Sequence, residues 1–319
     1  MTRIPLWMDS TFSCVLTGLW ISCIAQRYSH IGNAKRLVNV LSIAFGALMK
    51  FRSVHRANAQ RAINFENDAE DDPLFLRSVA RVMQVLNAFN DAHRPLSLSE
   101  IAVAARVDRS AAQRIVHTLR KLGYIARDAD DRGYILGLHV LDLTLDFMRL
   151  HPLVKRASPI LLELRRRVGE RLDMSLFDDT RVLYAVRMPS KRETFHATLP
   201  GHSVPVYCSS GGVAILARLD DDQARDIVAR SDRTPFTPFT MQDEEEVMRA
   251  VEETRRNGFA CLTNQIMNDE VAVGAAITAH DGRPLAAIHI AGSLLEWSKE
   301  EFVANFSALA LEAADAIGN

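Results

Sequence analysis

Two expected helices with almost no chain between them place the strongest constraint on this fold. Residues 97–105 begin with a Ser-Leu-Ser-Glu capping box, which predicts a short helix. Only Arg106 and Val107 follow before Asp108, a favourable N-cap residue for a second helix over residues 108–122. Two short helices joined this tightly are typical of a helix-turn-helix.

The segments on either side extend this motif into a winged helix. A preceding helix over residues 74–89 is predicted by an apolar stripe at helical spacing, formed by Leu76, Val79, Met83, Leu86 and Phe89. Downstream, residues 124–127 and 134–136 are predicted strands around a turn at residues 128–133. Three helices and a hairpin in this order predict a winged helix-turn-helix domain over residues 73–137.

The outer arc of the predicted 108–122 helix carries hydrogen-bonding side chains, namely Arg109, Ser110, Gln113, Arg114 and His117. Arginine can pair with guanine, and glutamine with adenine, in the major groove of DNA. Arg132 lies near the tip of the predicted hairpin, where it can contact a phosphate. These six residues are candidate contacts to double-stranded operator DNA. For the helix taken alone an ordinary solvated face is the stronger interpretation, and the predicted hairpin tips the balance towards DNA.

The charge of the chain is distributed unevenly between its parts. The formal net charge is -1, which by itself argues against strong binding to nucleic acid. Residues 73–137 carry ten Lys and Arg against six Asp and Glu, a net of +4, whereas residues 138–319 carry twenty against twenty-seven, a net of -7. A basic module joined to a larger acidic one suits a DNA reader. A chance fluctuation remains the alternative on charge alone.

Residues 1–72 form an N-terminal extension that we expect to be poorly ordered and outside the functional fold. Its apolar runs at residues 11–25 and 37–49 each fall short of the ~20 residues that a membrane span needs, so no membrane association is predicted. The first run has only a weak resemblance to a signal peptide. One hypothesis is an over-long gene start, with Met49 as one possible true start.

The cysteines favour a cytoplasmic protein without a metal site. The chain has four cysteines, none of them in a C-x-x-C pair or in any zinc-ligand pattern. Scattered thiols fit a reducing compartment better than a disulfide framework.

The remainder of the chain alternates predicted helices and strands. A linker helix is expected over residues 138–152, followed by an effector-binding and oligomerisation domain over residues 153–319. A hairpin around Asp281-Gly282 is the clearest turn signal there. Strands gathered into one antiparallel sheet with helices packed outside predict an α+β fold.

An ordered set of segments resembles the isocitrate lyase regulator (IclR) family. The segments are RSVARVMQVLNAF, RPLSLSEIAVAARVDRSAAQRIVHTLRKLGYIARD and GYILGLHVLDL, then GHSVPVYCSSGGVAILARL, NGFACLTNQ and EVAVGAAITAHDGRPLAAIHIAGS, so the resemblance covers about residues 74–318. It implies a winged helix joined to a GAF-like effector-binding domain, in homodimers or tetramers that bind palindromic operators and respond to a small organic effector. The chain departs from the family at Arg106-Val107, where Gly-Leu is common.

The same resemblance suggests which residues bind the effector. Aligned by eye, the polar anchor positions of the family fall on Leu262, Ala272, His289 and Ala291. Since the family often has an acidic residue, a cysteine and two serines there, we expect a more apolar ligand, such as an aromatic acid, with His289 bonding its carboxylate. Free N–H groups at the predicted helix start, Ser210 and Gly211, are a further candidate anion site, with plain helix capping as the alternative. A misaligned or degenerate pocket is the rival explanation.

Enzymatic function is not predicted. The segment GHSVP begins like a nucleophile elbow but has Pro205 where glycine is required. The sequence contains no H-E-x-x-H motif, no P-loop and no dinucleotide fingerprint, so no cofactor is expected. The leading hypothesis is a ligand-responsive DNA-binding transcription regulator of a catabolic operon. The alternatives are an effector-free oligomeric DNA-binding protein and an enzyme with an unrecognised site.

Overall fold

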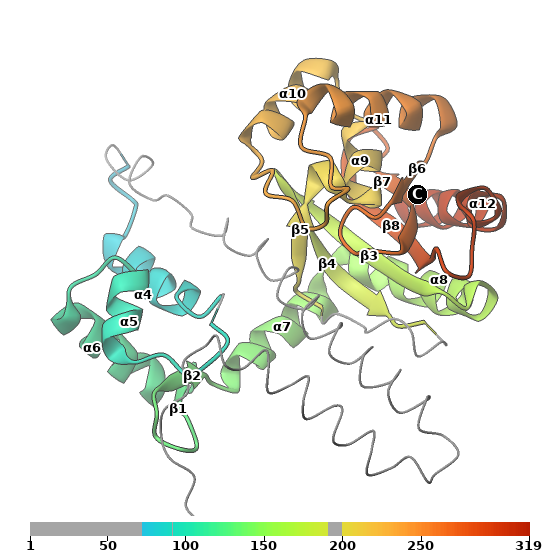
Figure 1. Cartoon of the computed structure of the whole chain (residues 1–319). Coiled ribbons are helices and arrows are strands. Elements are labelled where there is room, and N and C mark those ends of the chain that lie inside the picture. The colour runs from blue at the N-terminus through green and yellow to red at the C-terminus, as the bar shows by residue number, and fades with distance from the viewer. Residues whose placement is uncertain (1–71, 91, 191–199) are drawn as a thin grey trace, which may run out of the picture. The chain divides into compact units, whose positions relative to one another are not determined.

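A computed structural model describes residues 72–90, 92–190 and 200–319 (Figure 1). Nearly all of the N-terminal extension, including Met49, lies outside the described residues. The described chain forms a winged helix-turn-helix and a C-terminal α+β domain, so the predicted fold class is confirmed. Within these ranges no helix combines the length and apolar composition needed to cross a bilayer.

The winged helix is built around a small apolar core. Its elements are α4 (Arg77–Asn87), α5 (Leu98–Ala104), α6 (Arg109–Lys121), β1 (Ile125–Arg127) and β2 (Tyr134–Leu136). The core side chains come from all three helices and from β1, and they include Val85, Phe89, Ile101, Val116, Leu119 and Ile125. Leu96 pairs with Tyr134 through two backbone hydrogen bonds of 2.9 and 2.8 Å, which adds a short third strand to the hairpin.

The turn of the helix-turn-helix places a non-glycine residue in the left-handed region. Arg106 has a φ of 52°. The N–H groups of Arg106 and Val107 donate to the carbonyls of Val103 and Ala102 at 3.1 and 3.0 Å, which is the hydrogen-bonding pattern of a Schellman motif. Glycine adopts this conformation without steric cost, whereas arginine does not. The family's glycine at this position therefore has a physical explanation, and Arg106 carries local strain.

Replacing Arg106 by glycine is expected to stabilise the helix-turn-helix. Relief of the left-handed strain outweighs the added flexibility of the unfolded chain, for a net gain of about 0.5–1 kcal/mol. Amide hydrogen exchange of α5 and α6 in the full-length protein should then slow by roughly two- to fivefold. A Gly123→Ala variant is the matched control and should have the opposite effect, faster exchange. Gly123 has a φ of 79°, and an added Cβ would lie 2.6 Å from His139. Unchanged or faster exchange in the Arg106→Gly protein would contradict the strain argument.

Two helices carry apolar side chains that the fold leaves exposed. In the predicted stripe of α4, Phe89 is buried, whereas Leu76, Val79 and Met83 are exposed. Helix α7 (His139–Leu150) contains no buried residue. Its exposed large apolar side chains are Leu141, Leu143, Leu145, Phe147 and Leu150, and Leu138, directly before the helix, is exposed as well. Helical spacing identifies an apolar face but does not reveal what covers it.

The C-terminal domain contains one antiparallel sheet of six strands in the order β5-β4-β3-β8-β7-β6. The strands are β3 (Arg171–Asp178), β4 (Arg181–Met188), β5 (Ser203–Pro205), β6 (Ala260–Thr263), β7 (Glu270–Thr278) and β8 (Pro284–Ser293). The helices are α8 (Pro152–Val168), the 3-10 turn η2 (Val206–Cys208), α9 (Ser210–Leu216), α10 (Asp221–Arg230), α11 (Glu244–Asn257) and α12 (Lys299–Gly318). The central strands β3, β8 and β7 are therefore paired on both edges.

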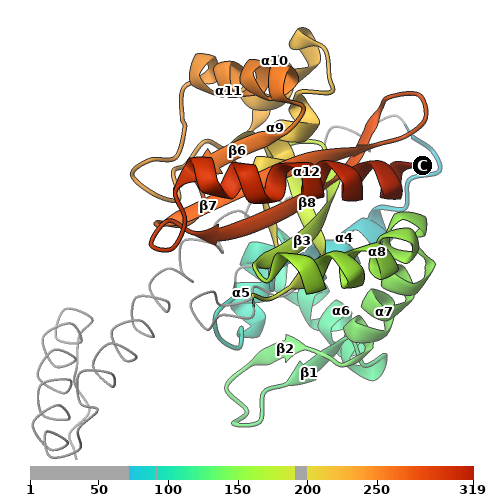
Figure 2. The same ribbon diagram turned by 90° about the vertical axis from the view of Figure 1, so that its right-hand side faces the viewer.

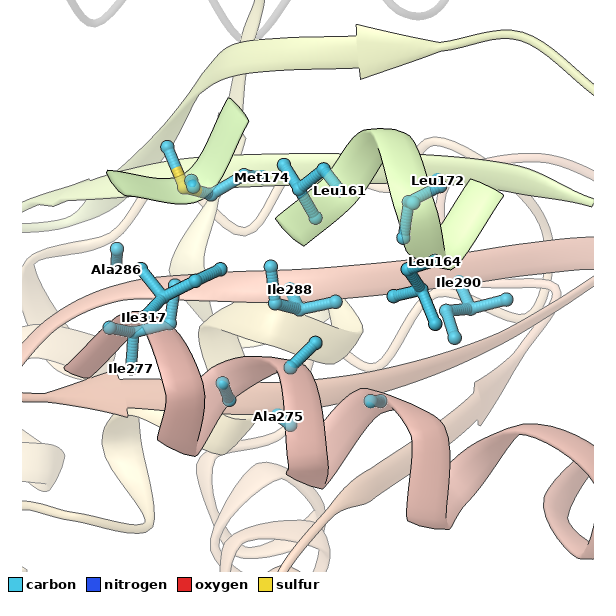
Figure 3. Close-up of a cluster of buried hydrophobic side chains, with 14 of the residues drawn as sticks. Leu161, Leu164, Leu172, Met174, Ala275, Ile277, Ala286, Ile288, Ile290 and Ile317 are labelled. Carbon is cyan, nitrogen blue, oxygen red and sulfur yellow. The ribbon is translucent and has the colours of Figure 1, made fainter. Parts of the chain in front are cut away.

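One face of the sheet is an apolar core closed by α8 and α12 (Figures 2 and 3). Alternate residues of the central strands point to this face, among them Leu172, Met174, Ile277, Ile288 and Ile290. The intervening residues point to the other face, which α9, α10 and α11 cover. That second face also buries charged residues, and it carries the candidate effector site.

Candidate DNA-contacting helix and effector pocket

The predicted outer face of α6 is exposed in the structure. Asp108 caps the helix by accepting a bond from Ala111 N at 2.8 Å. The side chains of Ala112, Val116 and Leu119 are buried in the core of the winged helix. The opposite arc is exposed and consists of Arg109, Ser110, Gln113, Arg114 and His117. The helix thus presents donors and acceptors on a face that the rest of the domain leaves accessible.

The charges at the tip of the wing are less favourable for binding a DNA phosphate than the sequence suggested. Arg132 is 69% exposed, but its guanidinium lies 2.5 Å from Asp130 and 3.5 Å from Asp128. Arg127 is paired with Asp131 at 3.1 Å. Two arginines and three aspartates over residues 127–132 give the tip a net charge of -1. A contact between Arg132 and phosphate would therefore have to replace ion pairs within the wing.

The second face of the sheet holds a pocket of mixed polarity. It is lined by fifteen residues, which are Arg171, Tyr184, Arg187, His202, Val204, Cys208, Ser209, Ser210, Leu262, Gln265, Ile266, Met267, Glu270, Ala272 and His289. Strand pairing brings these residues together, because Asp173 of β3 lies between Arg187 of β4 and His289 of β8. Arg171 and Asp173 alternate with the apolar core residues of β3 and so face the pocket side.

A chain of buried ion pairs forms the charged part of the site. Asp173 Oδ2 accepts from Arg171 Nε and from Arg187 Nη2, both at 3.0 Å. Arg171 Nη2 donates to Glu270 Oε1 at 2.5 Å, and this bond links β3 to β7 across the intervening strand β8. All four side chains are at most 8% exposed. Ion pairs this deeply buried rarely add to stability, and breaking one is costly.

Arg187 has hydrogen-bond donors that no other group of the described chain uses. Within the described part of the chain, neither its Nε nor its Nη1 has a hydrogen-bond partner, although both atoms are buried. Its guanidinium carbon lies 3.9 Å from the centre of the Tyr184 ring. Tyr184 is itself stacked on His202, with ring centres 6.1 Å apart. The arginine is thus held in place by Asp173 and Tyr184 while part of its donor capacity remains unused.

His289 uses both ring nitrogens within the protein. The backbone N–H of Gly211 can only donate, so Nδ1 is its acceptor at 3.3 Å, and Nε2 is left to donate to Ser175 Oγ at 2.7 Å. Burial, with a smaller contribution from the positive charges of Arg187 and Arg171, lowers the pKa of His289 to about 3. The histidine is therefore neutral at pH 7. The expected bond from His289 to a ligand carboxylate would require one of these contacts to be given up.

The expected effector residues differ in how they relate to the pocket. Ser210, Leu262, Ala272 and His289 line it, whereas Gly211 and Ala291 are not among the lining residues. The N–H of Gly211 is engaged by His289, so it is not available to an anion at the start of α9. Ala291 is paired with Arg171 in the sheet and is buried.

Sequence reasoning missed the charged residues Arg171, Arg187 and Glu270. A signal was present, because β3 reads RLDMSLFD, with polar residues at every second position. Such alternation is ordinarily read as a solvent-facing side of a strand. Here that side is covered by helices, so the polar residues are buried. In the described ranges no group of three or more His, Cys, Asp or Glu residues is placed to hold a metal ion.

The fold and these two sites together define a class. A winged helix with an exposed polar face, followed by an α+β domain with an internal pocket, is the architecture of a DNA-binding transcription regulator with its own ligand-sensing domain. Residues 146–319 match the family model described as "Bacterial transcriptional regulator IclR C-terminal", and residues 78–129 match the IclR helix-turn-helix domain. The chain belongs to the IclR family of bacterial transcription regulators.

Individual relatives agree with this assignment. The chain is 28% identical to the Pca regulon regulatory protein of Pseudomonas putida over 76% of its own length and 83% of the relative's. It is 21% identical to the p-hydroxybenzoate hydroxylase transcriptional activator of Acinetobacter baylyi, over 67% of its own length and 80% of the relative's.

Solved structures of transcription regulators share the fold of this chain. A transcriptional regulator from Rhodococcus sp. RHA1 is 27% identical with a TM-score of 0.65, covering 76% of this chain and 97% of that one. An IclR homologue from Microbacterium hydrocarbonoxydans, solved with 4-hydroxybenzoate, has a TM-score of 0.63 at 22% identity, covering 76% of this chain and 97% of that one.

Proposed function

We propose that this regulator binds the operator of a catabolic operon as a cytoplasmic homodimer and responds to an aromatic carboxylic acid. The observation that carries the effector part is the internal pocket, which combines buried arginines with apolar walls. Two relatives named above regulate the Pca regulon and p-hydroxybenzoate hydroxylase, and a structural neighbour was solved with 4-hydroxybenzoate. We assign no catalytic role to the chain.

The exposed arc of α6 supports the DNA-binding part of the proposal. Gln113 and Arg114 lie near the middle of the helix, and their side chains can reach base edges in the major groove. Arg109 donates to Ser99 Oγ at 2.5 Å, which ties the start of α6 to α5. Ser110 and His117 complete the proposed contact surface, and Arg132 of the wing is its outermost member.

The exposed apolar residues of α4 and α7 support the dimer. Contiguous apolar surface of this kind marks an interaction site in soluble proteins. On α7, Leu138, Leu141 and Leu145 follow one another at helical spacing, so a second copy can cover them with the same residues. Pairing at helices next to the DNA-binding domains would present two copies of α6 to two half-sites. Assembly of dimers into a tetramer remains part of the family expectation.

The lining of the pocket supports an aromatic acid in particular. Leu262 and Ala272 are paired across β6 and β7, and with Ile266 they form an apolar wall on which a ring can be buried. The pocket encloses about 30 Å³, which is enough for water but not for a ring. Ligand entry therefore requires the wall to move outward. Gln265, Ile266 and Met267 belong to the loop between β6 and β7 that would move.

Thermal unfolding tests the proposed effector class. A ligand present at about 100 times its Kd stabilises the folded protein by roughly 2.7 kcal/mol. For a domain of this size, that corresponds to a rise in Tm of roughly 5–10 °C. We expect this rise with 4-hydroxybenzoate or benzoate, together with a change in operator affinity, and little effect from glyoxylate or pyruvate.

Two other outcomes would lead to different conclusions. Preferential stabilisation by glyoxylate or pyruvate would refute the aromatic assignment. If none of the four acids changes either the Tm or the operator affinity, the effector-free alternative becomes the better account. In that case the C-terminal domain would serve only to assemble the DNA-binding domains.

A further inference from the structure

We infer that Arg187 is the carboxylate anchor of the effector pocket, and that the pocket selects a ligand with a single carboxylate. This inference rests on the proposed function, because it assigns a role within the same pocket. The proposed anchor therefore lies on strand β4. The family resemblance had indicated other positions, namely Leu262, Ala272, His289 and Ala291.

The unused donors of Arg187 are the first observation. A guanidinium has five N–H donors in a rigid plane. The side chain of Arg187 is 4% exposed, and only one of its nitrogens, Nη2, donates to Asp173. In the described ranges, Nε and Nη1 have no acceptor. Buried donors of this kind are uncommon and costly, so an arriving carboxylate gains strong charge-assisted bonds and relieves an existing penalty.

The two other candidate donors to a carboxylate, Arg171 and His289, are already engaged within the protein, which singles out Arg187. Arg171 donates from Nε to Asp173 and from Nη2 to Glu270, and its Nη1 lies 3.9 Å from Met267 Sδ. His289 is neutral and engaged on both ring nitrogens. A ligand carboxylate that displaced either residue would break an existing buried contact.

The charge balance of the site sets the number of carboxylates. Arg171 and Arg187 contribute two positive charges, and Asp173 and Glu270 contribute two negative ones, so the buried network sums to zero. One ligand carboxylate brings the site to -1, which the spare donors of Arg187 can stabilise. A second would bring it to -2, with no further spare cation in the network. Uncompensated buried charge is strongly unfavourable. The pocket should therefore discriminate against dicarboxylates.

Isothermal titration calorimetry on the full-length protein tests the anchor with three probes of similar shape. They are 4-hydroxybenzoate, its uncharged analogue 4-hydroxybenzamide, and the dicarboxylate terephthalate. The parent protein should prefer 4-hydroxybenzoate over each of the others by at least about tenfold. The Arg187→Gln variant should lose on the order of 10- to 100-fold in affinity for the acid while binding the amide as the parent does.

Two additional variants separate anchoring from folding. Arg181→Gln removes an arginine from the same strand that pairs with Asp178 and does not line the pocket, so it should bind the acid like the parent. The double variant Arg187→Gln with Asp173→Asn removes both charges of one ion pair, which keeps the network neutral. It should remain folded by thermal scan and still lack the preference for the acid over the amide.

The possible results distinguish this inference from the proposed function. Equal binding of the acid and the amide by the parent would overturn the anchor, as would parental affinity for the acid in either Arg187 variant. Tighter binding of terephthalate than of 4-hydroxybenzoate would overturn the single-carboxylate selectivity. Failure of the parent to bind any of the three probes would overturn the proposed aromatic effector, and this inference with it.

Discussion

Replacing Leu141 and Leu145 together by aspartate is expected to dissociate the proposed dimer and to lower operator affinity by roughly 100- to 10,000-fold. The loss in affinity follows from mass action, because two linked DNA-binding domains engage two half-sites at a high effective concentration and a monomer does not. Both leucines are 65% exposed, so the substitutions remove no core contact within one copy. Four aspartates would instead face one another across the proposed interface.

Sedimentation velocity and fluorescence anisotropy measure the two parts of this prediction. The DNA should be an operator selected from a randomised duplex pool with the parent protein. Leu295→Asp is the matched control, since Leu295 is 82% exposed and lies outside α4 and α7. The control should retain the sedimentation coefficient and the operator affinity of the parent. A double variant that still sediments as a dimer would show that α7 does not form the interface.

Replacing Arg114 by alanine should produce the second large loss. A bidentate contact to a base is worth about 1–3 kcal/mol, and in a homodimer the substitution removes it from both half-sites. The expected total is therefore about 2–6 kcal/mol, or roughly 30-fold to more than 10,000-fold in operator affinity. Gln113→Ala should act in the same direction, and both variants should tolerate more sequences at the contacted positions.

A variant in the wing should differ from Arg114→Ala in its effect on DNA binding. Arg132→Ala removes a residue that would contact only phosphate, so it should weaken all DNA sequences about equally and flatten the salt dependence. The effect should be small, because Arg132 is already paired with Asp130 and Asp128 in the wing tip. Operator binding by Arg114→Ala equal to that of the parent, in a gel-shift titration, would show that α6 does not read the bases.

The winged helix was accessible from sequence because its signals are local. The capping box of Ser97 and Glu100 is present in the structure, and the predicted helix over residues 108–122 corresponds to α6 (Arg109–Lys121). Caps and apolar spacing act within one or two turns of a helix, so neighbouring residues suffice to predict them. The apolar stripe at Leu76, Val79 and Met83 was equally visible, but its exposure depends on how α4 packs against α5 and α6.

The pocket was only partly accessible from sequence, for the opposite reason. Resemblance to the family led to Leu262, Ala272 and His289, and the predicted helix start led to Ser210; all four line the pocket. The charged network joins Arg171 to Glu270, which is ninety-nine positions away along the chain. Contacts of this range depend on strand order and register, which a single sequence does not display.

By itself, therefore, the sequence determined the order of the elements, the winged helix and the polar outer face of its third helix, and membership in a family of α+β regulators. Only the tertiary structure decided which polar residues are buried and what they contact. Pairing β3 between β4 and β8 places Asp173 beside both Arg187 and His289. The covering helices then exclude water from these side chains. Burial turns an ordinary alternation of polar residues into a site, because an unpaired donor is inexpensive in water and costly away from it.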